Sequence, residues 1–249
     1  SFLYSTTLFA QEGYEIKVTF KPFKNQYIYL GHYFGKSYPI IDSAMLNDKS
    51  EAVFKGSKKL NGGIYLIGYP NKAGFFEILV DKEQQFSIKA DTVSIAKGAQ
   101  FENSPDNILF SSYQQQMGNW GKKINSLQQQ LKAPASKADS TRIIAELKKT
   151  DKEVKDYRED FIKKNPHSLL AALLITMREP ELTGPLADPK TKDDSVAAYT
   201  SYKKQYWEGV NFWDGRLAYT TFFEEKLDKY FNQLVQPHPD SVIKEIDYM

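Results

Sequence analysis

The feature that most constrains the fold is a change of hydrophobic period near Gly98. In residues 14–20 every second residue is apolar, whereas beyond residue 104 apolar residues recur at steps of three and four. Alternation is typical of a strand with one buried face, and steps of three and four are typical of an amphipathic helix. The sequence therefore predicts an α+β chain, with a β-rich region followed by an all-α region.

The first region reads as a series of short strands. Turn residues such as Asn61-Gly62-Gly63 separate the apolar runs, and no helical spacing occurs between them. This pattern favours an antiparallel β-sandwich over residues 11–98. The expected strands cover 14–20, 27–30, 40–41, 52–54, 64–67, 75–80 and 86–88.

A helical domain is expected over residues 104–249. Ser104-Pro105-Asp106 is a strong start signal, because Ser favours the N-cap, Pro the first helical position, and an acid the positive end of the helix dipole. The segment 168–177 is nearly all apolar and should be the buried centre of the domain. The expected helices cover 105–131, 139–164, 168–177, 193–208, 213–235 and 240 onward.

Composition argues against several kinds of function. Lys and Arg number 33 against 31 Asp and Glu, so no basic surface for nucleic acid is expected. No cysteine is present, which excludes disulfides, thiolate metal sites and thiol redox chemistry within these residues. His32, His167 and His238 are far apart, and no phosphate-binding glycine loop or nucleophile motif occurs. We therefore expect no enzyme activity, no catalytic or metal-ligating residue and no cofactor.

Paired carboxylates are the remaining candidates for chemistry. The pairs are Glu224 with Glu225, Asp193 with Asp194, and Glu179 with Glu181. Adjacent residues on a helix point about 100° apart, so Glu224 and Glu225 cannot flank one bond of a substrate. Solvated helix faces explain all three pairs, although a hydrolase remains a third hypothesis.

An aromatic group between residues 202 and 231 is the most unusual feature of the helical domain. Its spacing fits core packing between two helices, because aromatic rings recur at helical steps. The same residues could instead form a docking surface for a protein partner, or a stacking platform for a sugar. The candidate docking residues are Tyr206, Trp207, Phe212 and Trp213.

The first residues suggest export. Residues 2–11 resemble the end of an apolar signal sequence, with Ala10 as the small residue before a cut, so residues 1–10 are expected to be a signal-peptide remnant. An ordinary first strand is the alternative. No later apolar stretch reaches the roughly 18 residues that a membrane span needs. We expect a periplasmic or otherwise exported protein of the bacterial envelope, without a membrane span and without nucleic acid as a partner.

Two stretches also resemble known domains. Residues 27–30, 41–44, 52–56 and 63–66 are similar to a β-sandwich domain of unknown function, found at the N-terminus of exported thioredoxin-like proteins of Gram-negative bacteria. The middle glycine of that pattern is replaced here by the turn 48–51. Residues 161–168, 212–217 and 239–243 resemble the helical domain of unknown function that follows the sandwich in some of these proteins.

The resemblance implies an association with thiol–disulfide exchange or peroxide-reductase-like domains. The leading hypothesis is a non-catalytic accessory region of an envelope thioredoxin-like oxidoreductase, which positions the redox domain or docks its partner. On this hypothesis the natural chain continues past Met249 into a thioredoxin-like domain with paired cysteines. The alternative is a stand-alone periplasmic binding protein for a peptide, a glycan or a protein.

Overall fold

A computed structural model describes residues 13–72, 74–92 and 98–248, so the expected signal segment 1–10 lies outside the described residues. The chain divides into two compact units. The sandwich unit holds the described residues up to 32 and from 38 to 115, and the helical unit holds 33–37 and those from 116 onward. The predicted α+β class, with strands first and helices after them, is confirmed.

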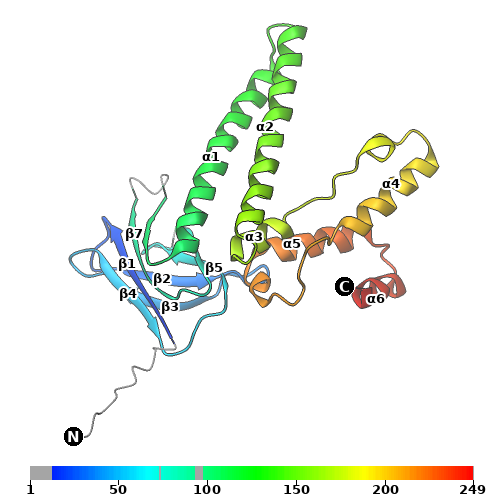
Figure 1. Ribbon diagram of the computed structural model, residues 1–249. Coiled ribbons are helices and arrows are strands. Elements are labelled where there is room, and N and C mark those ends of the chain that lie inside the picture. The colour runs from blue at the N-terminus through cyan, green and yellow to red at the C-terminus, as the bar shows by residue number, and fades with distance from the viewer. Residues whose placement is uncertain (1–12, 73, 93–97, 249) are drawn as a thin grey trace, which may run out of the picture. The chain divides into compact units, whose positions relative to one another are not determined.

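The sandwich unit contains two four-stranded sheets (Figure 1). The strand order is β4-β1-β7-β8 in the first sheet and β3-β2-β5-β6 in the second. One pairing differs from the antiparallel expectation, because β1 and β7 run parallel, with Ile16 opposite Phe86 and Val18 opposite Ile88. The strands are β1 (Tyr14–Lys21), β2 (Tyr27–His32), β3 (Ile40–Met45), β4 (Glu51–Gly56), β5 (Gly63–Gly68), β6 (Phe75–Val80), β7 (Gln85–Asp91) and β8 (Gln100–Glu102).

The core of the sandwich lies between the two sheets. Alternate residues of each strand point inward, as period-two patterning requires. The first sheet contributes Ile16, Val18, Phe20 and Phe54, all almost fully buried. The second sheet adds Ile28, Leu30, Tyr65, Ile67, Ile78 and Val80.

The edge of the second sheet at β6 is closed by a side chain of α1 (Pro105–Lys132). The amide of Asn107 accepts the Leu79 N–H at 2.7 Å and donates to the Leu79 carbonyl, also at 2.7 Å. Its Nδ2 also donates to Ser104 Oγ at 2.8 Å, and Asn107 is fully buried. An unpaired strand edge invites pairing with another chain, and Asn107 occupies these two backbone groups as a neighbouring strand would.

The opposite edge, β3, is held by Asp42. One carboxylate oxygen accepts the Ser43 N–H at 2.7 Å, and the other accepts the Tyr14 hydroxyl of β1 at 2.9 Å. Burial and the bond to Asp42 raise the pKa of Tyr14 to about 12. Asp42 therefore links the two sheets through Tyr14 and accepts a hydrogen bond from one backbone N–H of the edge strand β3.

The turn between β3 and β4 is organised by one asparagine. Asn47 Oδ1 accepts the N–H groups of Lys49 and Glu51, at 2.8 and 3.0 Å. Ser50 adopts a φ of 66°, in the left-handed region that favours glycine. Its carbonyl accepts the Phe20 N–H at 2.8 Å, which fixes the turn against β1.

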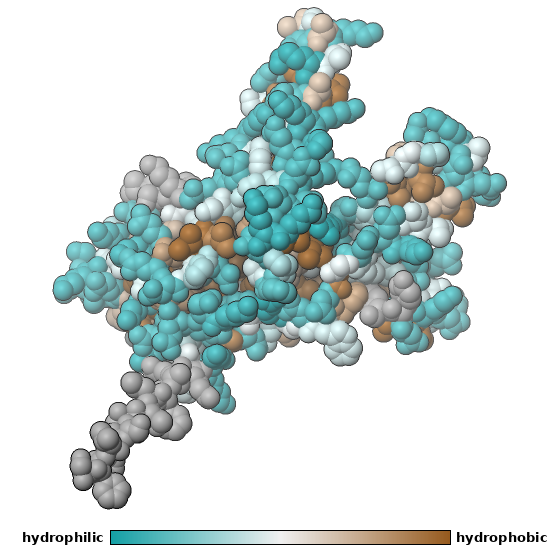
Figure 2. All heavy atoms as spheres, in the orientation of Figure 1, coloured by the Kyte–Doolittle hydropathy of each residue, from teal (hydrophilic) through white to brown (hydrophobic). Residues whose placement is uncertain are grey.

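Two long helices open the helical part of the chain and lie side by side (Figure 1). They are α1 and α2 (Lys137–Lys164), and the Ser136 side chain caps α2 by accepting the Asp139 N–H. Within the helical unit Trp120 packs edge-on against Tyr157, with 5.3 Å between ring centroids. Lys123 Nζ lies 2.6 Å from Glu146 Oε1. Figure 2 shows a mainly hydrophilic surface on these two helices.

The later helices are shorter. The apolar helix α3 has six of its eight residues buried, as expected from its sequence. A capping box of Thr191 and Asp194 begins α4. In the described residues no helix is long and apolar enough to cross a bilayer. The elements are α3 (Leu169–Thr176), η2 (Gly184–Ala187), α4 (Lys192–Gln205), η3 (Gly215–Tyr219), α5 (Thr221–Lys229), η4 (Tyr230–Leu234) and α6 (Pro239–Tyr248).

The single helix expected over 213–235 is not formed. The segment is split into the 3₁₀ turn η3, the α-helix α5 and the π-helical turn η4. Thr220 has extended φ and ψ angles, and its hydroxyl donates to the Leu217 carbonyl at 2.8 Å, which separates η3 from α5. Side-chain bonding of this kind competes with the helical backbone.

Candidate functional site

The structure divides the predicted aromatic group into an interior part and a surface part. Tyr206 and Tyr230 are each 1% exposed and stack with 5.3 Å between their centroids. Leu234 and Val235 pack in the same cluster. Tyr206, one of the four candidate docking residues, therefore belongs to the core of the helical unit and offers no surface to a partner.

A lysine lies inside this aromatic interior. Lys226 is only 6% exposed, its Nζ donates to the Arg178 carbonyl at 2.6 Å, and the Tyr206 ring centroid is 4.2 Å away. Burial lowers the pKa of Lys226 to about 8. Sequence reasoning missed it because lysine is usually solvated, although its spacing of three from Phe223 and four from Tyr230 places it on the same apolar helix face.

Three of the carboxylates singled out in the sequence, Glu179, Glu181 and Asp194, have structural partners. Glu179 lies 2.8 Å from Lys229 Nζ and accepts the Tyr202 hydroxyl. Burial raises the pKa of Glu179, but these two bonds together outweigh it and hold the pKa below its ordinary value. Glu181 pairs with Lys155, and Asp194 serves the capping box. No group of His, Asp and Glu in the described residues is arranged to hold a metal ion.

Trp207, Phe212 and Phe223 form a half-buried layer next to the aromatic interior. The Trp207 and Phe212 centroids are 5.1 Å apart, and Phe212 meets Phe223 edge-on at 5.9 Å. The buried indole N–H of Trp207 makes no hydrogen bond within the described part of the chain. This layer anchors the start of the loop that follows.

Trp213 differs from all its aromatic neighbours, because its side chain is 95% exposed. The residue before it, Phe212, is packed in the half-buried layer. The backbone N–H of Trp213 donates to Asn211 Oδ1 at 3.0 Å. The ring is thus presented to solvent by a backbone that is held in place.

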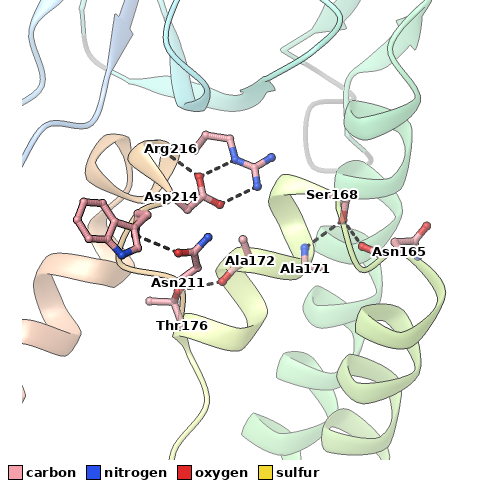
Figure 3. A network of polar contacts seen from close by, with 9 residues as sticks. Asn165, Ser168, Ala171, Ala172, Thr176, Asn211, Asp214 and Arg216 are labelled. Carbon is pink, nitrogen blue, oxygen red and sulfur yellow. Dashed lines mark hydrogen bonds and ion pairs between the residues drawn. The ribbon is translucent and has the colours of Figure 1, made fainter. Parts of the chain in front are cut away.

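The residue after Trp213 is fixed as well. Asp214 accepts the Arg216 guanidinium through both oxygens, from Nε at 2.8 Å and from the terminal nitrogen at 2.7 Å. The same carboxylate accepts the Arg216 backbone N–H at 3.1 Å, which opens η3, and the pair holds the pKa of Asp214 below its usual range. Figure 3 shows this pair beside Asn211 and the helix that carries Ala172 and Thr176. One turn later, buried Leu217 anchors η3.

The arrangement suits recognition of a partner. A large apolar ring that is exposed on a fixed loop can bury most of its surface against a partner at little entropic cost. Tryptophan is also enriched among the residues that dominate protein interfaces. Of the four predicted docking residues, Trp213 is fully presented, Trp207 and Phe212 support it, and Tyr206 is interior.

Comparisons with models of protein families, with curated protein sequences and with solved structures give no match to this chain.

Proposed function

We propose that this chain is a non-catalytic binding module that holds a protein partner through Trp213. The exposed indole on the braced loop 211–216 carries the proposal. Burial of this indole against a partner would be favourable, because it removes a large apolar surface from water. The bonds of Asn211 and Asp214 hold the backbone on both sides of the ring, as a preformed anchor requires.

The resemblance in sequence supports a narrower form of this proposal. In this form the chain is an accessory region of an exported envelope protein, and the partner is a thioredoxin-like domain or a protein on which that domain acts. A stand-alone periplasmic binding protein remains the second candidate. Reading the coding sequence beyond Met249 separates the two, because only the accessory form expects a following domain with paired cysteines.

Site-specific photocrosslinking tests the binding role. A photoreactive phenylalanine analogue replaces Trp213 in the cells that make the protein, and the matched control carries it at Ile144, another exposed apolar position. We expect one discrete adduct from position 213 and none from position 144. An excess of the unlabelled wild-type chain should suppress the adduct, and an excess of the Trp213→Ala chain should not. Equal competition by both chains would show that Trp213 does not hold the partner.

A further inference from the structure

A groove of about 300 Å³ lies in the helical unit, and no described residue of the Trp213 loop lines it. In the described part of the chain it is lined by one face of α4, by Tyr230 of η4 and by two residues of α6. The lining residues are Tyr199, Thr200, Lys203, Lys204, Tyr230, Lys244 and Glu245.

One wall of the groove is apolar and fixed. The Tyr199 hydroxyl donates to the Leu234 carbonyl at 2.6 Å, which orients the ring along α4, and the side chain is still about half exposed. Val196, three residues earlier on the same helical face, is exposed as well. Figure 2 shows apolar side chains gathered over α4. A flat apolar group could therefore lie against Tyr199.

The negative charge of Glu245, the one acid among the described lining residues, is already balanced by a lysine. Glu245 accepts Lys203 Nζ on one oxygen and the Tyr230 hydroxyl on the other, both at 2.5 Å. Burial raises the pKa of Glu245, but these two bonds outweigh it and keep the carboxylate ionised at neutral pH. Lys203 and Glu245 therefore balance each other's charge.

Two positive charges are left over. Lys204 and Lys244 line the groove from α4 and α6, and both are exposed. Neither forms an ion pair with a carboxylate among the described residues, whereas Lys203 of α4 and Lys229 of α5 do so. The groove thus combines an aromatic wall with a net charge of about +2, from three lysines and one glutamate.

We propose that this groove binds a small organic anion, whose carboxylate or phosphate lies between Lys204 and Lys244 and whose flat apolar part lies against Tyr199. Opposite charge attracts the ligand, and the apolar wall selects against a bare inorganic ion. The volume suits a compact ligand rather than a folded partner. This proposal does not depend on the Trp213 proposal.

Isothermal titration of the full chain at low ionic strength tests it. The probes are phenyl phosphate and benzoate as organic anions, inorganic phosphate as an anion without an apolar part, and benzylammonium as the matched cation. We expect saturable binding of at least one organic anion. Its affinity should fall about tenfold in the double variant Lys204→Gln/Lys244→Gln and fall with added salt, because exposed charge pairs are individually weak and screened.

The matched control is Lys148→Gln/Lys163→Gln, which removes two exposed lysines of α2 and should leave the affinity unchanged. Three results would overturn the proposal: no saturable binding of either organic anion at millimolar concentration, equal binding of benzylammonium or of inorganic phosphate, or an unchanged affinity in the Lys204→Gln/Lys244→Gln variant.

Discussion

Replacing Asn107 by Leu should destabilise the sandwich unit strongly, although leucine is similar in size and more apolar. Asn107 is fully buried, and its amide satisfies both the N–H and the carbonyl of Leu79, which is itself 2% exposed. Leaving a buried backbone group without a partner costs about 1–3 kcal/mol. Two such groups, less the gain from burying an apolar side chain, give a loss of about 3 kcal/mol in the free energy of unfolding.

Amide hydrogen exchange measured by mass spectrometry is the appropriate assay, because a chain with two units need not unfold in one step. A loss of about 3 kcal/mol corresponds to roughly 100-fold faster exchange of the slowest amides in the sandwich strands. Peptides from α2 should be unaffected. The matched control is Asn125→Leu, an exposed asparagine on the same helix. If the amides of β5 and β6 exchange as slowly in Asn107→Leu as in this control, the Asn107 side chain does not close the sheet edge.

Three further outcomes are expected. Ser50→Gly should raise the melting temperature of the sandwich unit, because glycine relieves about 1 kcal/mol of left-handed strain at a φ of 66°; an unchanged or lower value would count against that strain. Gly56→Ala should cost about 1–3 kcal/mol in urea unfolding, because its Cβ would lie 2.3 Å from Tyr14 Cε1 and displace the ring from Asp42. Folding lowers the pKa of Lys226 from 10.5 to about 8, so between these pH values the native state binds fewer protons than the unfolded state. The contribution of Lys226 to the free energy of unfolding therefore rises with pH in this range. Urea unfolding at pH 7.5, 9 and 10 should show that the free energy of unfolding of the wild type rises relative to that of Lys226→Met as the pH rises. A difference between the two proteins that does not change with pH would refute this.

The fold class followed from local patterns that depend on few residues. Alternation in residues 14–20 placed Ile16, Val18 and Phe20 inside the sandwich, where they are buried. Ser104-Pro105 marked the start of α1 at the correct residue. These features are local, because the hydrophobic period and the cap chemistry act within a few residues of each other.

The pairing of distant segments could not be predicted in this way. The parallel arrangement of β1 and β7 depends on how the chain returns to the first sheet, and side-chain alternation is the same in parallel and antiparallel strands. The strand β8 has only three residues and gives no recognisable period. The break at Thr220 depends on one hydroxyl bond that competes with the helix.

The candidate site was predictable in part. Spacing grouped Trp207, Phe212 and Trp213 with the aromatic core, but it could not show which ring is exposed. That depends on Asn211 and Asp214, which brace the loop through side-chain bonds. The burial of Lys226 also required the fold, because its partner is the carbonyl of Arg178, 48 residues away.

The exposure of Trp213 gives the protein an optical reporter of its own. The chain has three tryptophans, and an indole that is almost fully in water should emit at longer wavelength and meet a dissolved quencher far more often than the packed Trp207. Iodide should therefore remove the red part of the emission first. Any molecule that covers loop 211–216 should shift that part of the spectrum to the blue, without a label attached to the chain.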